Sequence, residues 1–87
     1  MHVVYTGHVQ GVGFRYTVKS LAPGFEVTGT IRNLSDGSVS LKAEGTRAEL
    51  EAFRQAIRDS GLDRLIADEQ TSWSEARNEF RGFTIVG

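Results

Sequence analysis

The stretch from Gly7 to Arg15, Gly-His-Val-Gln-Gly-Val-Gly-Phe-Arg, constrains the fold of this chain more than any other segment. A Val- and Tyr-rich run precedes it and a helix-like pattern follows it, so it predicts a turn between a strand and a helix. The backbone N–H groups of such a turn can converge, and the helix N-terminus adds partial positive charge there. The arginine adds a planar fork that grips two phosphate oxygens. The stretch therefore predicts a cradle for a small dianion, most simply a phosphoryl group.

Hydrophobic periodicity divides the chain into strands and helices in the order βαββαβ. A Thr46-x-x-Glu49 capping box marks the start of the second helix, and Asp36-Gly37 predicts a tight turn after the second strand. The predicted strands cover residues 2–8, 25–33, 38–45, part of 63–74 and a short run at 83–86, and the helices begin at Phe14 and Thr46 and end before Pro23 and Gly61.

This order predicts an α+β, ferredoxin-like βαββαβ sandwich, with an antiparallel sheet and both helices on one face. The run at 83–86 is expected to add a short extra strand at the edge of the sheet. A chain of 87 residues has the size of one domain, so residues 1–87 are expected to form a single domain. The starting methionine and this length favour a standalone protein.

The predicted topology also brings a distant amide to the glycine-rich turn. The first and second strands run parallel with the third between them, so their C-terminal ends lie at the same edge of the sheet. Asn33 shares the strand parity of Val27 and Ile31, which are expected to face the helices. Its amide is therefore expected to point toward the turn and Arg15, where it would donate to a phosphate oxygen or hold a water molecule.

Composition excludes several classes of function. The formal net charge of −1 argues against broad affinity for nucleic acid or for an anionic membrane, and no apolar run has the length of a membrane span. Zero cysteines leave no thiolate nucleophile or thiolate metal site, and favour the cytoplasm. His2 and His8 lie six residues apart with no carboxylate between them, so neither a metal nor a cofactor is expected.

Two other glycine-rich phosphate loops fail on spacing. A dinucleotide-binding fingerprint that begins at Gly11 would need a glycine at the position of Tyr16. A P-loop that begins at Gly7 would need glycine and lysine where Val12 and Gly13 stand.

The segment from Gly7 to Arg15 resembles the G-x-V-Q-G-V-x-F-R signature of the acylphosphatases. Residues 29–33, Gly-Thr-Ile-Arg-Asn, followed by Asp-Gly-Ser-Val at 36–39, resemble the second motif of that family, G-x-V-[RK]-N-x-x-D-G-x-V. Glu44-Gly45 and the terminal Gly-Phe-Thr-Ile at 82–85 also fit. The resemblance covers essentially the whole chain and implies the same sandwich fold. The activity that it implies is hydrolysis of acyl phosphates, the mixed anhydrides of a carboxylate and phosphate.

The resemblance also implies the roles of particular residues. Arg15 and Asn33 take the positions of the catalytic arginine and asparagine. The substrate phosphate is expected to bind backbone N–H groups of the loop, from Val9, Gln10, Gly11, Val12, Gly13 and Phe14. Water positioned by Asn33 would attack the phosphorus in line, without a metal ion. The expected partner is a small-molecule acyl phosphate, and the expected protein is a cytoplasmic monomer that binds neither nucleic acid nor membrane.

An alternative from another class is a non-catalytic ferredoxin-like module that binds an anion, an effector or another protein, because an anion cradle can bind without reacting. An RNA-binding version would carry aromatic residues on its central strands, and the run from Ser38 to Gly45 has none. A third possibility is a domain like those inside multidomain carbamoyl-transfer enzymes. Phosphate release from a simple acyl phosphate, with and without EDTA, distinguishes the enzyme from the module.

Overall fold

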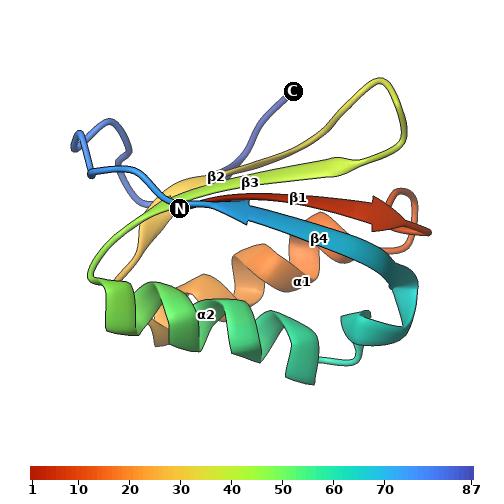
Figure 1. Ribbon diagram of the computed structural model, residues 1–87, viewed down its shortest axis with the longest axis horizontal. Helices are drawn as coiled ribbons and strands as arrows, with labels where there is room; N and C mark the ends of the chain where they lie inside the picture. Colours follow the sequence, from red (N-terminus) through yellow and green to blue (C-terminus); the bar gives the residue numbers. More distant parts are fainter.

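The structure, a computed structural model, describes residues 1–87 and contains one five-stranded sheet with both α-helices on the same face (Figure 1). This arrangement confirms the predicted ferredoxin-like α+β fold. Neither helix has the length and continuous apolar character that a membrane span needs. The elements are β1 (His2–Gly7), α1 (Phe14–Leu21), η1 (Ala22–Gly24), β2 (Thr28–Asn33), β3 (Val39–Glu44), α2 (Arg47–Asp59), η2 (Leu62–Leu65), β4 (Ile66–Ser72) and β5 (Phe83–Ile85), where η marks a short 3₁₀ helix.

The strands lie in the order β4-β1-β3-β2-β5. The first four pair antiparallel, as predicted, but β5 runs parallel to β2, so the expectation of a wholly antiparallel sheet is wrong at this edge. The cause is the path of residues 73–82, which we call the strap. The strap leaves β4 at the end of the sheet where β2 begins and crosses to the far edge, so β5 starts beside the start of β2 and pairs Phe83 with Gly29.

The second strand is shorter than predicted, because it begins at Thr28 rather than at residue 25. The N–H of Phe25 bonds instead to the carbonyl of Ala22 and closes η1 at 3.0 Å. The Phe25 ring still reaches the core, where its centroid lies 5.6 Å from that of Phe53. Phe25 therefore packs partly buried against the core without belonging to a strand.

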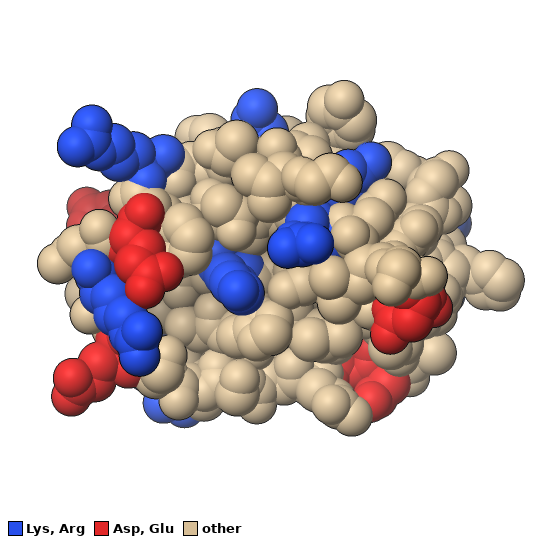
Figure 2. Space-filling model, turned by 90° about the horizontal axis from the view of Figure 1, so that it is seen from above, with Lys and Arg blue, Asp and Glu red and all other residues tan.

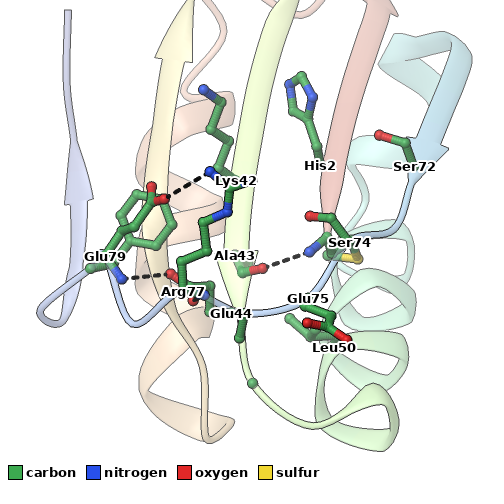
Figure 3. A pocket seen from close by; sticks show the side chains of 14 residues that line it. His2, Lys42, Ala43, Glu44, Leu50, Ser72, Ser74, Glu75, Arg77 and Glu79 are labelled. Carbon is green, nitrogen blue, oxygen red and sulfur yellow. Dashed lines mark hydrogen bonds and ion pairs between the residues drawn. The ribbon is translucent and has the colours of Figure 1, made fainter.

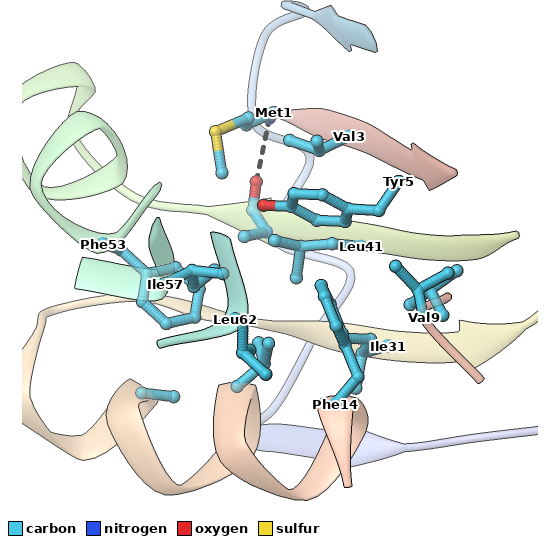
Figure 4. Packing of buried hydrophobic residues seen from close by; sticks show 14 of the residues in the cluster. Met1, Val3, Tyr5, Val9, Phe14, Ile31, Leu41, Phe53, Ile57 and Leu62 are labelled. Atoms are coloured by element: carbon cyan, nitrogen blue, oxygen red, sulfur yellow. Dashed lines mark hydrogen bonds between the residues drawn. The ribbon is translucent and has the colours of Figure 1, made fainter. Parts of the chain in front are cut away.

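The core fills the space between the sheet and the helices (Figure 4). Alternate residues of the central strands, such as Tyr5 and Leu41, point into it and are fully buried. Phe14, the first residue of α1, is 1% exposed, and its ring centroid lies 5.1 Å from that of Tyr5. Burying a side chain of this size contributes about 1.5–3 kcal/mol. This contact therefore fixes the N-terminus of α1 against β1.

The capping box at the start of α2 is only half formed. The Thr46 hydroxyl accepts the N–H of Glu49 at 3.2 Å, as the motif predicts. The Glu49 carboxylate, however, accepts the N–H of Glu26 at 2.7 Å instead of turning back to Thr46. This carboxylate ties α2 to the segment before β2.

The face of the sheet that lies away from the helices is polar. Figure 2 shows basic side chains near the middle of this face and acidic side chains toward its two ends. Strand parity places His2 and Val4 of β1 and Ser40 and Lys42 of β3 on it. The two central strands therefore present no aromatic side chain on the open face.

Candidate active site

The loop between β1 and α1, residues 8–13, takes its shape from two glycines. Gly11 and Gly13 have φ of 74° and 78°, in the left-handed region that other residues enter at a cost. Gly13 is also the N-cap of α1. The loop therefore turns sharply into the first turn of the helix.

From Val9 onward, the backbone N–H groups of this loop have no acceptor in the protein. From Val9 to Gly13, none donates to a carbonyl, and no side chain accepts from them. The first turn of α1 continues this row of N–H groups, because the opening residues of a helix have no partner one turn back. The first turn carries no acidic side chain. Together these groups form an electropositive site of the kind that binds phosphate.

The loop is held in place at both sides. The N–H of His8 donates to the carbonyl of Leu65 at 3.0 Å, beside the start of β4. Gly7 makes this approach possible, because a Cβ there would lie 2.4 Å from the oxygen of Leu65. On the other side, Nε2 of Gln10 donates to the carbonyls of Leu34 and Ser38 at 2.8 and 2.9 Å. The conformation of the loop is therefore fixed by its neighbours before any ligand binds.

Arg15 lies one residue inside α1 and is half-buried. Its guanidinium takes part in no ion pair, whereas Arg54 and Arg58 are bound to carboxylates on α2 and β4. The first 25 residues contain no Asp or Glu. An arginine at the N-terminal turn of a helix without a carboxylate partner is available to an anion.

Asn33 is the last residue of β2 and shares the helix-facing side with Ile31, as the strand parity predicted. Its Oδ1 is buried without a hydrogen-bond partner. Leaving such a group unpaired costs about 1–3 kcal/mol. The Nδ2 group makes no hydrogen bond within the protein. The donor and the acceptor of this amide are therefore both free to bind a ligand or a water molecule.

The loop and the residues after Asn33 are in direct contact through Gln10, and α1 packs against β2. The structure therefore brings the predicted loop and the end of β2 to the same edge of the sheet. The contact by the Gln10 side chain was not foreseen. A glutamine inside a glycine-rich loop gives no local signal of a long-range bond, since its partners are backbone carbonyls 24 and 28 residues away.

The carboxylate near this edge is a poor candidate for a base. Asp36 lies in the turn between β2 and β3, where it accepts the hydroxyl and the N–H of Ser38 at 2.5 and 3.0 Å. These two bonds lower the pKa of Asp36. No group of three or more His, Cys, Asp or Glu side chains is placed to hold a metal ion.

Apolar surface borders the same loop. Val12 and Tyr16 are the large hydrophobic residues that the fold leaves exposed, at 45% and 72%. Val12 precedes the N-cap of α1 and Tyr16 lies in its first turn. A ligand in the loop would therefore meet both N–H groups and apolar side chains.

A cavity of about 300 Å³ lies at the opposite end of β1, beside His2 and under the strap (Figure 3). The two ends of this six-residue strand are ~17 Å apart. In this region the Glu44 carboxylate accepts three successive N–H groups of the strap, from Arg77, Asn78 and Glu79, at 2.6, 2.7 and 2.9 Å. The strap donors thus already have an acceptor, in contrast to those of the loop.

The comparisons with known proteins agree with the motifs. A family model described as acylphosphatase matches residues 1–85. The acylphosphatase of Salinibacter ruber is 41% identical over 80 residues, which cover 92% of this chain and 84% of that relative. The crystal structure of acylphosphatase from Bacillus subtilis has a TM-score of 0.88 and 31% identity, covering 99% of this chain and 96% of that chain. The crystal structure of full-length HypF in the phosphate- and nucleotide-bound form has a TM-score of 0.81 and 28% identity, covering 99% of this chain but 11% of that chain.

Proposed function

This chain belongs to the acylphosphatase family and hydrolyses acyl phosphates, and we propose that Arg15, Asn33 and the loop of residues 9–14 carry out this reaction without a metal ion. The observation that carries the proposal is the row of loop N–H groups without an acceptor. Arg15 without an ion pair and the unpaired amide of Asn33 support it.

Binding follows from charge and donor geometry. The N–H groups of residues 9–14 and the guanidinium of Arg15 take up the three phosphoryl oxygens. The transition state of phosphoryl transfer is loose and spreads negative charge over these oxygens. Donors that are already fixed in place stabilise this charge without reorganising.

The attacking water is held by Asn33. Its Nδ2 donates to the water oxygen and aligns it with the P–O bond that breaks. The water oxygen forms the new bond to phosphorus, and the electron pair of the breaking bond leaves with the acyl carboxylate. A phosphoryl oxygen of the substrate takes the proton from water, since the N–H and hydroxyl of Ser38 already occupy the Asp36 carboxylate.

The test is phosphate release from acetyl phosphate by the wild type and by Arg15→Ala, with and without EDTA. We expect steady turnover by the wild type that EDTA does not change, and a loss of about 10²–10³ in the variant. A wild type that binds inorganic phosphate but releases none from acetyl phosphate would support the non-catalytic module instead. Turnover that EDTA abolishes would contradict the metal-free mechanism.

We also propose that residues 1–87 act as one domain, as a monomer in the cytoplasm, on small acyl phosphates rather than on nucleic acid. The net charge of −1 and the open sheet face without aromatic side chains support the last point. Light scattering coupled to size exclusion measures the mass of the protein in solution. A mass twice that of the chain would contradict the monomer.

A further inference from the structure

The side chain of Gln10 makes the direct bridge between the loop and the segment that follows Asn33. Both bonds come from a single NH₂ group, whose two hydrogens go to the carbonyls of Leu34 and Ser38 at 2.8 and 2.9 Å. Leu34 is the residue next to Asn33 along the chain. One side chain of the loop is thus bonded one residue away from the amide that is proposed to hold water.

The two accepting carbonyls also close the turn between β2 and β3. The N–H of Leu34 donates to the Ser38 carbonyl at 2.8 Å, and the N–H of Gly37 donates to the Leu34 carbonyl at 3.2 Å. The Asp36 carboxylate holds the N–H and hydroxyl of Ser38. The turn is therefore rigid by itself, so Gln10 is bonded to a fixed frame and not to a mobile tip.

We propose that Gln10 is a positioning residue, which sets the distance between the phosphate-binding loop and Asn33. The proposal rests on the proposed function, because it assigns the water to Asn33 and the phosphoryl group to the loop. Hydrolysis needs the water and the phosphorus to be aligned, and these two groups are held by segments at least 18 residues apart in sequence. A misplacement of about 1 Å between reacting groups can cost about 10²-fold in rate.

The chemistry of the bridge is specific to an amide. A side chain that bridges two carbonyl groups needs two N–H donors on one atom, at the distance that a glutamine side chain reaches. Methionine has a similar length and no donor. Glutamate has the same shape, but its carboxylate would face two carbonyl oxygens, so only its protonated form can donate.

The experiment measures steady-state hydrolysis of acetyl phosphate by Gln10→Met and Gln10→Glu, at a temperature where circular dichroism shows both folded. The control is Gln55→Met, because Gln55 also donates through Nε2, to Asp59 on the exposed side of α2. We expect kcat of Gln10→Met to fall about 10- to 100-fold. The inhibition constant of inorganic phosphate should change less than about threefold, since the loop donors and Arg15 remain. The control should match the wild type.

A second variant separates positioning from a general structural effect. In an Asn33→Ala background, Gln10→Met should cost less than about threefold more, because the group that it positions is already gone. In Gln10→Glu, kcat should recover only in part as the pH falls, because the protonated carboxyl group has one O–H donor and can restore one of the two bonds. The positioning role would be wrong if folded Gln10→Met kept kcat within twofold of the wild type. It would also be wrong if Gln10→Met lowered kcat by the same factor in the Asn33→Ala background as in the wild type. Undiminished kcat in Asn33→Ala alone would instead overturn the proposed function.

Discussion

Two segments of this chain gather backbone N–H groups, and they differ in what those groups bind. In the strap, the N–H groups of residues 77–79 all donate to the Glu44 carboxylate. Figure 3 shows Glu44 beside Arg77 and Glu79. In the loop between β1 and α1, the N–H groups of residues 9–13 donate to nothing in the protein. The backbone physics is the same, so the difference lies in the side chains within reach. A gathered row of N–H groups indicates a ligand site only where the chain has not supplied its own anion.

The charges around the two segments account for this difference. The strap carries two glutamates and two arginines and approaches the carboxylate of Glu44, which accepts its N–H groups. The segment up to residue 25 contains no acidic residue, and its α1 turn holds Arg15. Both segments use left-handed backbone, at Asn78 in the strap and at glycines in the loop. Local conformation therefore does not distinguish a structural turn from a binding loop, whereas the presence of a carboxylate that accepts the N–H groups does.

Removing one arginine from each segment gives the largest expected difference between the loop and the strap. Arg15→Ala should lower kcat/KM for acetyl phosphate by about 10²–10³, through the loss of a charged donor at the phosphoryl group. Arg77→Ala is the matched control, since its side chain is 80% exposed and lies 4.0 Å from Glu79. In steady-state kinetics, kcat/KM of Arg77→Ala should stay at the wild-type value, so the two variants should differ by about 10²–10³. Equal losses would mean that the loop has no special role.

A second pair of variants, at Asn33 beside the loop and at Asn78 in the strap, compares activity with stability. Asn33→Ala should lower kcat by about 10² while the free energy of unfolding stays equal or rises by about 1 kcal/mol, because an unpaired buried oxygen is removed. Asn78→Ala should leave kcat unchanged and lower the free energy of unfolding by about 1 kcal/mol, since alanine tolerates φ of 55° less well than asparagine does. Urea unfolding and kinetics on each variant provide the measurement. A large loss of stability in Asn33→Ala would show that the amide serves the fold.

The sequence predicted the fold and the place of the candidate site, but not the long-range bonds of side chains to the backbone. Residue spacing alone predicted the sandwich, the edge shared by the loop and Asn33, and the helix-facing side of β2. The direction of β5 was missed, because a three-residue run gives no signal of the path that the strap takes to reach it. The bonds of Gln10 and Glu44 were missed for a related reason. Each connects a side chain to backbone groups 24 to 35 residues away, and backbone groups have no sequence signature.

Inorganic phosphate should stabilise the protein through the loop alone. At a concentration 100 times its Kd, a ligand that binds only the folded state adds about 2.7 kcal/mol to the free energy of unfolding. We expect phosphate to raise the Tm of the wild type and of Glu44→Gln equally, and that of Arg15→Ala much less. Differential scanning calorimetry across a phosphate series tests this. A phosphate response that survives intact in Arg15→Ala would place the anion elsewhere.

Glu44→Gln examines the strap. A neutral amide retains one acceptor oxygen but loses the charge that three N–H groups share, and hydrogen bonds to charged acceptors are the stronger kind. The Tm should fall, while kcat/KM for acetyl phosphate stays within about twofold, since the two ends of β1 are ~17 Å apart. Glu75→Gln, on the same strap, is the control and should leave both values unchanged. Loss of activity in Glu44→Gln would connect the two segments.

Acid should weaken the bonds between Glu44 and the strap. Hydrogen bonds from the backbone N–H groups, with that of Glu79 the largest, lower the pKa of Glu44 below its ordinary value of 4.5. A carboxyl group with a lowered folded pKa stabilises the protein above its unfolded pKa and loses this contribution as the pH falls through the folded pKa. Thermal unfolding between about pH 6 and pH 2 should therefore show a steeper acid decline in the wild type than in Glu44→Gln. Parallel curves would contradict this.

The short β5 has a consequence for behaviour at high concentration. It covers the outer edge of β2, a six-residue strand whose N–H and carbonyl groups would otherwise face solvent. Exposed strand edges recruit other chains, and a very short edge strand offers them little to pair with. Three residues, bonded through Gly29 and Val86, thus protect the sheet against self-association.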